Sequence, residues 1–301
     1  MVTVHTPVMS NEVLAQLVPF RADALIVDGT LGEGGHSMGF LRTYPECRVI
    51  GIDIDPVMGR RAMNRLETPR KRFELMTGWT DEILASWVKR APDIILLDLG
   101  VSRFHYECSG RGFSFRADEP LDMRLDESSE RNAADLVNSL EEDDLAKLIF
   151  TYGEERYSRR ISRSIVEQRR KAPIVNTGQL VGVVSRAIPR KARHGRIHAA
   201  TRTFQALRIV VNRELDRLAA ILNVAPTMLA AKGRLGIISF HSLEDRLVKR
   251  CYRAHDGRYG GDCHILTRKP LLPSAEECRS NPSSRTAKFR VLKKASIGDS
   301  P

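Results

Sequence analysis

Cysteine is scarce in this 301-residue chain, and its five cysteines (Cys47, Cys108, Cys251, Cys263 and Cys278) include no CxxC pair. This scarcity excludes a disulfide framework and a zinc ribbon, and we expect no bound metal. The first 28 residues also lack a long apolar run, since polar and charged side chains are mixed among the apolar ones. A signal peptide and a membrane span are excluded there, so we expect a soluble, cytoplasmic protein.

Acidic residues are fewer than basic ones. The chain has 37 Asp and Glu against 48 Lys and Arg, which gives 48 − 37 = +11 and a pI near 9.7. A protein with this excess is suited to a polyanionic partner, of which nucleic acid is the first candidate. The hydrophobic share of 42% is enough for one large core or two smaller ones.

Short apolar runs alternate with helix-length amphipathic segments over the first hundred residues. Four runs are typical of buried strands, at 25–28, 48–53, 73–76 and 93–98, and the segments between them are typical of helices, at 36–42, 56–66 and 80–90. This alternation predicts an α/β fold with a doubly wound parallel sheet. Further strands are expected at 234–240 and 287–292.

About 135 residues separate the fourth and fifth expected strands, far more than one crossover helix needs. We therefore expect a discontinuous sheet domain, residues 1–110 and 203–301, with an inserted, mainly helical domain at 111–202. A long helix from residue 203 to about 222 is assigned to the sheet domain.

The insertion is divided by charge. Residues 118–144 carry eleven acids and two bases, a net of 2 − 11 = −9. Residues 156–208 carry fourteen bases and one acid, a net of 14 − 1 = +13. So many uncompensated positive charges repel one another unless a polyanion screens them, which favours contacts with phosphates over a merely solvated face.

A glycine-rich turn, DGTLGEGGH at 28–36, follows the first expected strand and opens a helix. It is not a GxGxxG dinucleotide motif, because Ser37 stands where the third glycine is needed. It does fit the acidic-x-x-x-Gly-x-Gly turn of a class I S-adenosylmethionine methyltransferase, from Asp28 through Gly32 and Gly34.

Acidic residues end two further strands. Asp53 and Asp55 close the second strand, where a carboxylate can accept both hydroxyls of a ribose, and Asp53 is favoured. Trp79 follows the third strand and can lie against an adenine, although a core or surface role is nearly as plausible. Asp98 ends the fourth strand, where a methyl donor and its acceptor can meet; the alternative is a helix or turn cap.

Two more segments carry candidate site residues. RGFSFR at 111–116 and PLDMRLD at 120–126 combine aromatic rings, guanidinium groups and carboxylates, a mixture that can stack on and hydrogen-bond an unstacked base. His241 follows the fifth strand and is either a base or a structural hydrogen-bonding residue.

Together these blocks resemble the RsmH/MraW family of bacterial small-subunit ribosomal RNA (cytosine-N4) methyltransferases. The resemblance runs in order from about residue 6 to 291. It rests on DGTLGEGGH (28–36), LDLGVS (97–102), RGFSF (111–115), PLDMR (120–124), YGEER (152–156), ATRTFQALR (200–208) and ISFHSLEDR (238–246).

The resemblance implies transfer of a methyl group from S-adenosylmethionine to the exocyclic N4 of one cytidine in the decoding region of 16S ribosomal RNA, within the small ribosomal subunit. It assigns cofactor contacts to Gly34, Gly35, His36, Asp53, Trp79, Asp98 and His105. His105 stands where the family has a cofactor-contacting Gln, and a His ring can form a similar hydrogen bond. Self-association as a homodimer stays open.

For catalysis we expect Asp98 and the His241-Ser242 tip to orient the N4 amine, because an acceptor that pulls on an amine hydrogen raises its reactivity. Arg111, Phe113, Phe115 and Arg202 are expected to hold the substrate RNA. Two alternatives compete with this hypothesis. One is a non-enzymatic RNA-binding or ribosome-assembly factor, and the other is a methyltransferase or dehydrogenase that acts on a small molecule.

Overall fold

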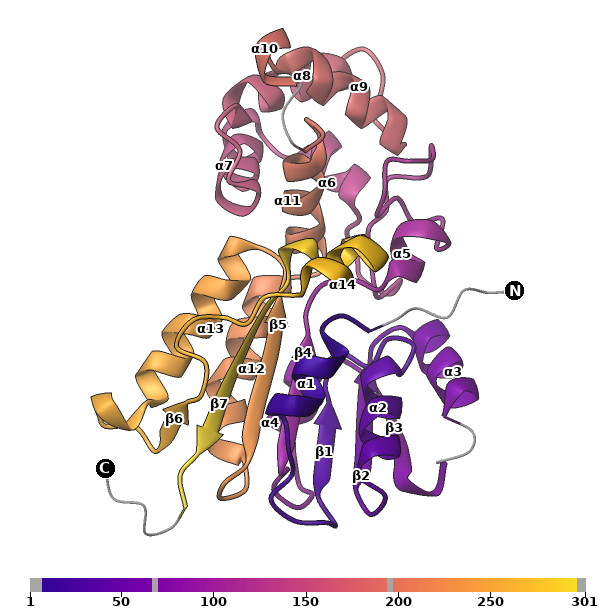
Figure 1. The fold of residues 1–301 in the computed structure, drawn as a ribbon. Helices are drawn as coiled ribbons and strands as arrows, with labels where there is room; N and C mark the ends of the chain where they lie inside the picture. Colours follow the sequence, from indigo (N-terminus) through magenta and orange to yellow (C-terminus); the bar gives the residue numbers. More distant parts are fainter. Residues whose placement is uncertain (1–6, 67–69, 194–196, 297–301) are drawn as a thin grey trace. The chain divides into compact units, whose positions relative to one another are not determined.

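The computed structural model describes residues 7–66, 70–193 and 197–296, and the chain divides into two compact units (Figure 1). The sheet unit comprises Met1–Gly100 and Leu215–Pro301, and the helical unit comprises Val101–Glu214. The helical unit thus extends beyond the expected 111–202 segment at both ends. It takes in the first part of the helix expected at 203–222, whereas the part from residue 215 lies in the sheet unit as predicted.

In the described residues, the sheet unit holds one seven-stranded sheet of order β3-β2-β1-β4-β5-β7-β6. The first five strands are parallel, and β7 runs antiparallel to both neighbours. The strands are β1 (Leu25–Asp28), β2 (Arg48–Asp53), β3 (Phe73–Thr77), β4 (Ile94–Asp98), β5 (Arg234–Ser239), β6 (Cys263–Ile265) and β7 (Lys288–Lys294). The expected strands are confirmed, and only β6 was not predicted.

Helices cover both faces of this sheet, because successive strand residues point to opposite sides. Ile26 packs into a core with helices α1, α2 and α3, whereas its neighbour Val27 packs into a second core with α4, α12 and α13. The helices of the sheet unit are α1 (Ser10–Gln16), α2 (Gly35–Thr43), α3 (Pro56–Arg65), α4 (Thr80–Ala85), α12 (Glu214–Met228), α13 (Ser242–His255) and α14 (Ala275–Ser280).

The order of the strands places the functional edge of the sheet. The chain runs outward from β1 to β2 and β3, and then returns to add β4 on the other side of β1. Ligands of such sheets bind beyond the carboxyl ends of the strands at this switch point. The residues that can reach a ligand there are therefore those that follow β1, β2 and β4.

The helical unit has its own hydrophobic core, which includes Leu145, Ile149, Ile161, Val184 and Leu207. Its helices are α5 (Arg103–Glu107), α6 (Ala133–Ser139), α7 (Glu142–Gly153), α8 (Ser158–Arg169), α9 (Thr177–Ala187), α10 (Arg190–Arg193) and α11 (Thr201–Val211). Each of the longer helices contributes one apolar face to this core, so its charged residues are left at the surface.

The single helix expected at 203–222 is two helices, α11 and α12. Between them, Asn212 ends α11 and Arg213 has a positive φ of 52°. The buried Asn212 side chain accepts a hydrogen bond from the Leu125 N–H (2.8 Å) and donates to the carbonyls of Met123 (2.8 Å) and Arg208 (3.0 Å). The apolar spacing continues across the break, so the pattern could not reveal it.

Removing the Asn212 amide should destabilise the helical unit. In an Asn212→Ala variant the Leu125 N–H and the Met123 carbonyl lose a buried partner, and we expect the free energy of unfolding to fall by about 2–4 kcal/mol. Urea denaturation measures this loss. The exposed Asn223→Ala in α12 is the control and should stay within about 0.5 kcal/mol of the parent; equal losses would contradict the role given to Asn212.

Candidate active site

The glycine-rich turn joins β1 to α2 at the carboxyl edge of the sheet. Gly32 and Gly34 have φ values of 51° and 74°, a left-handed backbone that side chains disfavour. The Leu31 N–H donates to the Ile52 carbonyl (3.0 Å), which anchors the turn to β2. A Cβ built on Gly32 meets no atom within 4 Å among the described residues. The turn therefore borders open space where a ligand can approach its backbone.

Asp53 faces this turn from the end of β2. Its carboxylate accepts hydrogen bonds from the Gly32 and Asp55 N–H groups, both at 2.8 Å. Asp55, the alternative candidate, is buried and caps α3 by accepting from the Val57 N–H (2.7 Å). The structure therefore favours Asp53 as the acid open to a ligand. Desolvation raises the pKa of the Asp53 carboxyl to about 7.

Asp98 and His36 meet at the tip of β4. The His36 ring is buried at the start of α2, and its Nε2 lies 3.4 Å from Asp98 Oδ2. The Asp98 backbone N–H donates to Thr30 Oγ1 (2.6 Å), which fixes the end of the strand against the glycine turn. Asp98 Oδ1 is buried and accepts no hydrogen bond within the described part of the chain. A buried carboxylate oxygen without a donor is costly, so it is a ready acceptor for a ligand proton.

Asp28 lies behind this pair as the last residue of β1. It is fully buried, and its Oδ2 accepts from the Ser37 hydroxyl (2.7 Å). Desolvation raises the pKa of this carboxyl, while the nearby His36 ring acts in the opposite direction. Asp28 therefore anchors the start of α2 through Ser37.

His241 is the N-cap residue of α13. Its Nδ1 accepts from the Glu244 N–H (3.4 Å), and its Nε2 lies 3.1 Å from Glu244 Oε1. Of the two roles considered for His241, this geometry supports the structural one. Ser242 is the first residue of the same helix and is partly exposed. Their catalytic roles stay predictions.

Trp79 precedes α4 and has a neighbour that sequence analysis missed. The guanidinium carbon of Arg217 lies 3.7 Å from the centre of the indole, and Nη1 of the same side chain donates to Asp81 at 2.7 and 3.0 Å. Arg217 is 138 residues away in sequence, so no local pattern signals this cation–π pair. One face of the indole is covered, and an adenine would have to use the remainder of the ring.

The remaining predicted residues belong to the helical unit. His105 is buried, with Nδ1 2.9 Å from Ser102 Oγ, and it stays a predicted cofactor contact. Arg111 donates hydrogen bonds to the carbonyls of Arg124 and Leu125 (3.1 and 3.2 Å). It therefore stabilises the loop between residues 111 and 125.

Phe113 and Phe115 differ in exposure. Phe113 is 4% exposed and packs in the helical core, which argues against the prediction that it stacks on a base. Phe115 is partly exposed, with its ring centre 4.7 Å from that of His198 and 5.0 Å from that of Phe204. Arg202 is 45% exposed and lies 3.8 Å from Glu155 Oε2. Phe115 and Arg202 therefore stay available to a ligand.

These observations fit a nucleoside-bearing sulfonium cofactor. The turn offers open backbone at Gly32, Asp53 offers a carboxylate for a ribose, and Asp98 offers an oxygen with no donor among the described residues. Together they can hold a ligand across the ends of β1, β2 and β4 and accept a proton at the last of them.

Residues 2–295 match the model of the MraW methylase family. The chain belongs to that family. Its relatives include the ribosomal RNA small subunit methyltransferase H of Treponema denticola, 48% identical over 99% of both chains. The protein of the same name in Synechococcus elongatus is 46% identical over 96% of this chain and 94% of its own. Among solved structures, an rRNA methylase from Streptococcus thermophilus aligns with a TM-score of 0.40 at 13% identity, covering 95% of each chain.

Membership in the MraW methylase family confirms three predictions. The chain is an enzyme, its reaction is methyl transfer and its cofactor is S-adenosylmethionine. The order of the strands confirms the predicted doubly wound α/β fold. No helix in the described ranges is long and apolar enough to span a bilayer.

The raised pKa of Asp53 predicts a pH-dependent affinity. Below pH 7 the carboxyl is mostly protonated, whereas above pH 7 it is ionised and accepts ribose hydroxyls more strongly. The affinity for S-adenosylhomocysteine should therefore fall about tenfold between pH 8 and pH 6. Calorimetric titration measures this change. An Asp53→Asn variant should bind with little pH dependence, and a parallel fall in that variant would assign the titration to another group.

Proposed function

We propose that this methylase transfers the methyl group of S-adenosylmethionine to the exocyclic N4 of a single cytidine in the decoding region of 16S ribosomal RNA, within the small ribosomal subunit. Family membership supports methyl transfer, and relatives named ribosomal RNA small subunit methyltransferase H support the substrate class. The single structural observation that carries the proposal is the buried Asp98 Oδ1, which has no donor among the described residues.

Cofactor binding is assigned to the carboxyl edge of the sheet. Gly34, Gly35 and His36 hold the methionine end, Asp53 accepts the ribose hydroxyls and Trp79 contacts the adenine. His105 stays the predicted counterpart of the family's Gln. The bound cofactor supplies an electrophilic methyl carbon on a sulfonium, whose sulfur keeps the bonding electrons when the methyl group leaves.

Asp98 prepares the amine for attack. Cytosine N4 is a poor nucleophile because its lone pair is conjugated with the ring. A hydrogen bond from the amine to Asp98 Oδ1 draws electron density toward N4 and gives the departing proton an acceptor. The His36 ring lies beside Asp98, with Nε2 3.4 Å from Asp98 Oδ2. The partly exposed Phe115 and the exposed Arg202 are the candidates for holding the target nucleotide and its neighbours, whereas Arg111 positions the loop that carries Phe115.

The decisive experiment is transfer of radiolabelled methyl from S-adenosylmethionine to small ribosomal subunits from cells that lack this activity, followed by nucleoside analysis. We expect N4-methylcytidine at one position. Label on another nucleoside would contradict the proposed target. No transfer despite intact cofactor binding would favour an earlier assembly intermediate, another RNA or a non-catalytic assembly factor.

A further inference from the structure

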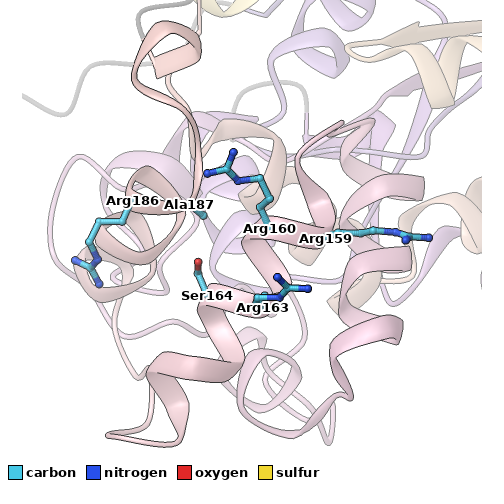
Figure 2. A pocket seen from close by; sticks show the side chains of 6 residues that line it. All are labelled: Arg159, Arg160, Arg163, Ser164, Arg186 and Ala187. Carbon is cyan, nitrogen blue, oxygen red and sulfur yellow. The ribbon is translucent and has the colours of Figure 1, made fainter.

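A basic hollow lies in the helical unit between α8 and α9. Its volume is about 520 Å³. The six residues that line it are Arg159, Arg160, Arg163, Ser164, Arg186 and Ala187, and we call this set the arginine hollow. Figure 2 shows the first four on α8 and the last two on α9. All six residues belong to the helical unit.

The hollow arises because each helix buries its apolar face. Ile161, Ile165 and Val166 of α8 are buried. The three arginines therefore fall on the exposed side of the helix. Val183 and Val184 of α9 are buried in the same way, whereas Arg186 is exposed. Small side chains, Ser164 and Ala187, leave room between these arginines.

Little negative charge pairs with the three arginines that α8 contributes to the hollow, within the described ranges. Among the described residues, no acid pairs with Arg159 or Arg160. Arg163 Nε lies 3.6 Å from Glu142 Oε1, but both side chains are open to solvent, at 71% and 43% exposure. Such an exposed pair is weak because water screens it. Arg159 and Arg160 therefore bring positive charge to the hollow that no acid among the described residues pairs with.

Other arginines of the basic stretch serve the fold. Arg169 donates to the Val137 carbonyl (2.9 Å), and Arg208 forms a two-pronged ion pair with Glu214 at 2.8 and 3.0 Å. The +13 charge of residues 156–208 is therefore not one uniform surface. The structure separates arginines that hold the unit together from those that gather around the hollow.

We propose that the arginine hollow binds consecutive phosphates of the RNA backbone and anchors the substrate RNA to the helical unit. This inference rests on the proposed function, since it names how that substrate is held. Guanidinium groups pair with phosphate oxygens through two parallel hydrogen bonds. The six lining residues include no aromatic ring on which a base could stack, so the hollow contacts the backbone rather than the sequence of the RNA.

The test compares two double variants with equal loss of charge. Arg159→Gln with Arg160→Gln removes two charges from the hollow, whereas Arg170→Gln with Lys171→Gln removes two exposed charges outside it. Affinity for protein-free 16S rRNA is measured at several KCl concentrations. The hollow variant should bind at least about tenfold more weakly at 0.1 M salt, with a salt slope smaller by about 1.4, the value expected for two phosphate contacts on a single strand. The control should keep most of its affinity and slope.

A second experiment looks for a gain in RNA affinity, which a variant that has merely unfolded cannot show. Glu142→Gln removes the acid beside Arg163, and we expect it to tighten RNA binding about threefold at low salt. Equal losses in the two double variants, together with no gain in Glu142→Gln, would overturn the hollow as a site. Normal binding to protein-free rRNA with lost binding to subunits would also overturn it, because the hollow would then contact a ribosomal protein.

Kinetics separate this inference from the proposed function. With small subunits as substrate, the hollow variant should raise KM about tenfold or more while kcat and affinity for S-adenosylhomocysteine stay near those of the parent. If subunits accept no methyl group but rRNA binding still depends on Arg159 and Arg160, the proposed function fails and the hollow stands. If methylation proceeds with an unchanged KM, the hollow fails and the proposed function stands.

Discussion

Methyl transfer by an Asp98→Asn variant should be slower than that of the parent by about two to four orders of magnitude, the usual contribution of a positioned proton acceptor. The amide keeps the size of the carboxylate but accepts the amine proton far less well. Its affinity for S-adenosylhomocysteine should change by only a few-fold, since Thr30 and the glycine turn still fix the end of β4. Single-turnover kinetics and calorimetry measure the two quantities. Equal losses in turnover and in cofactor binding would remove Asp98 from catalysis.

His241 is the matched control for Asp98, because both were predicted to act on the amine. Asn is a good helix N-cap, so His241→Asn retains the hydrogen bond to the start of α13 while removing the imidazole. If His241 is a cap, turnover should stay within a few-fold of the parent. A loss as large as that of Asp98→Asn would restore the catalytic role predicted for it.

Replacing Asp53 with Ala should weaken the binding of S-adenosylmethionine about 100-fold. The variant loses charge-assisted hydrogen bonds to a ribose, each worth about 1.5–3 kcal/mol, and it also leaves the Gly32 N–H without its acceptor. Calorimetric titration measures the affinity, and thermal denaturation shows whether the fold persists.

Asp55→Ala tests whether the effect belongs to Asp53 alone. Asp55 caps α3, so its loss should lower the free energy of unfolding by about 1 kcal/mol while cofactor affinity falls much less. A larger affinity loss in Asp55→Ala than in Asp53→Ala would reverse the assignment of the ribose acceptor.

Most of the parallel strands could be predicted because they are apolar runs that are buried on both faces, as in β1 and β4. The run at 25–28 coincides with β1, and that at 48–53 coincides with β2. By contrast β6 has three residues, Cys263–Ile265, and it is a strand only because it pairs with β7. Such a short edge strand has no periodicity of its own to detect.

Some residues of the candidate site could likewise be predicted from the sequence, and others could not. Asp53 and Asp98 were predictable because a polar residue at the end of a buried strand must face the edge of the sheet. The capping role of His241 could not be separated from a catalytic one, since both place a polar residue after a strand. Burial of Phe113 could not be anticipated either, because it depends on helices far along the chain.

The sequence by itself determined the class of fold, the glycine turn and the identity of the acids at the strand ends, because these depend on local hydrophobic pattern and backbone freedom. Tertiary structure alone decided the break at Asn212, the cover of Arg217 over Trp79 and the gathering of arginines between α8 and α9. Each of these depends on contacts between residues distant in sequence, whose energies appear only when the chain is packed.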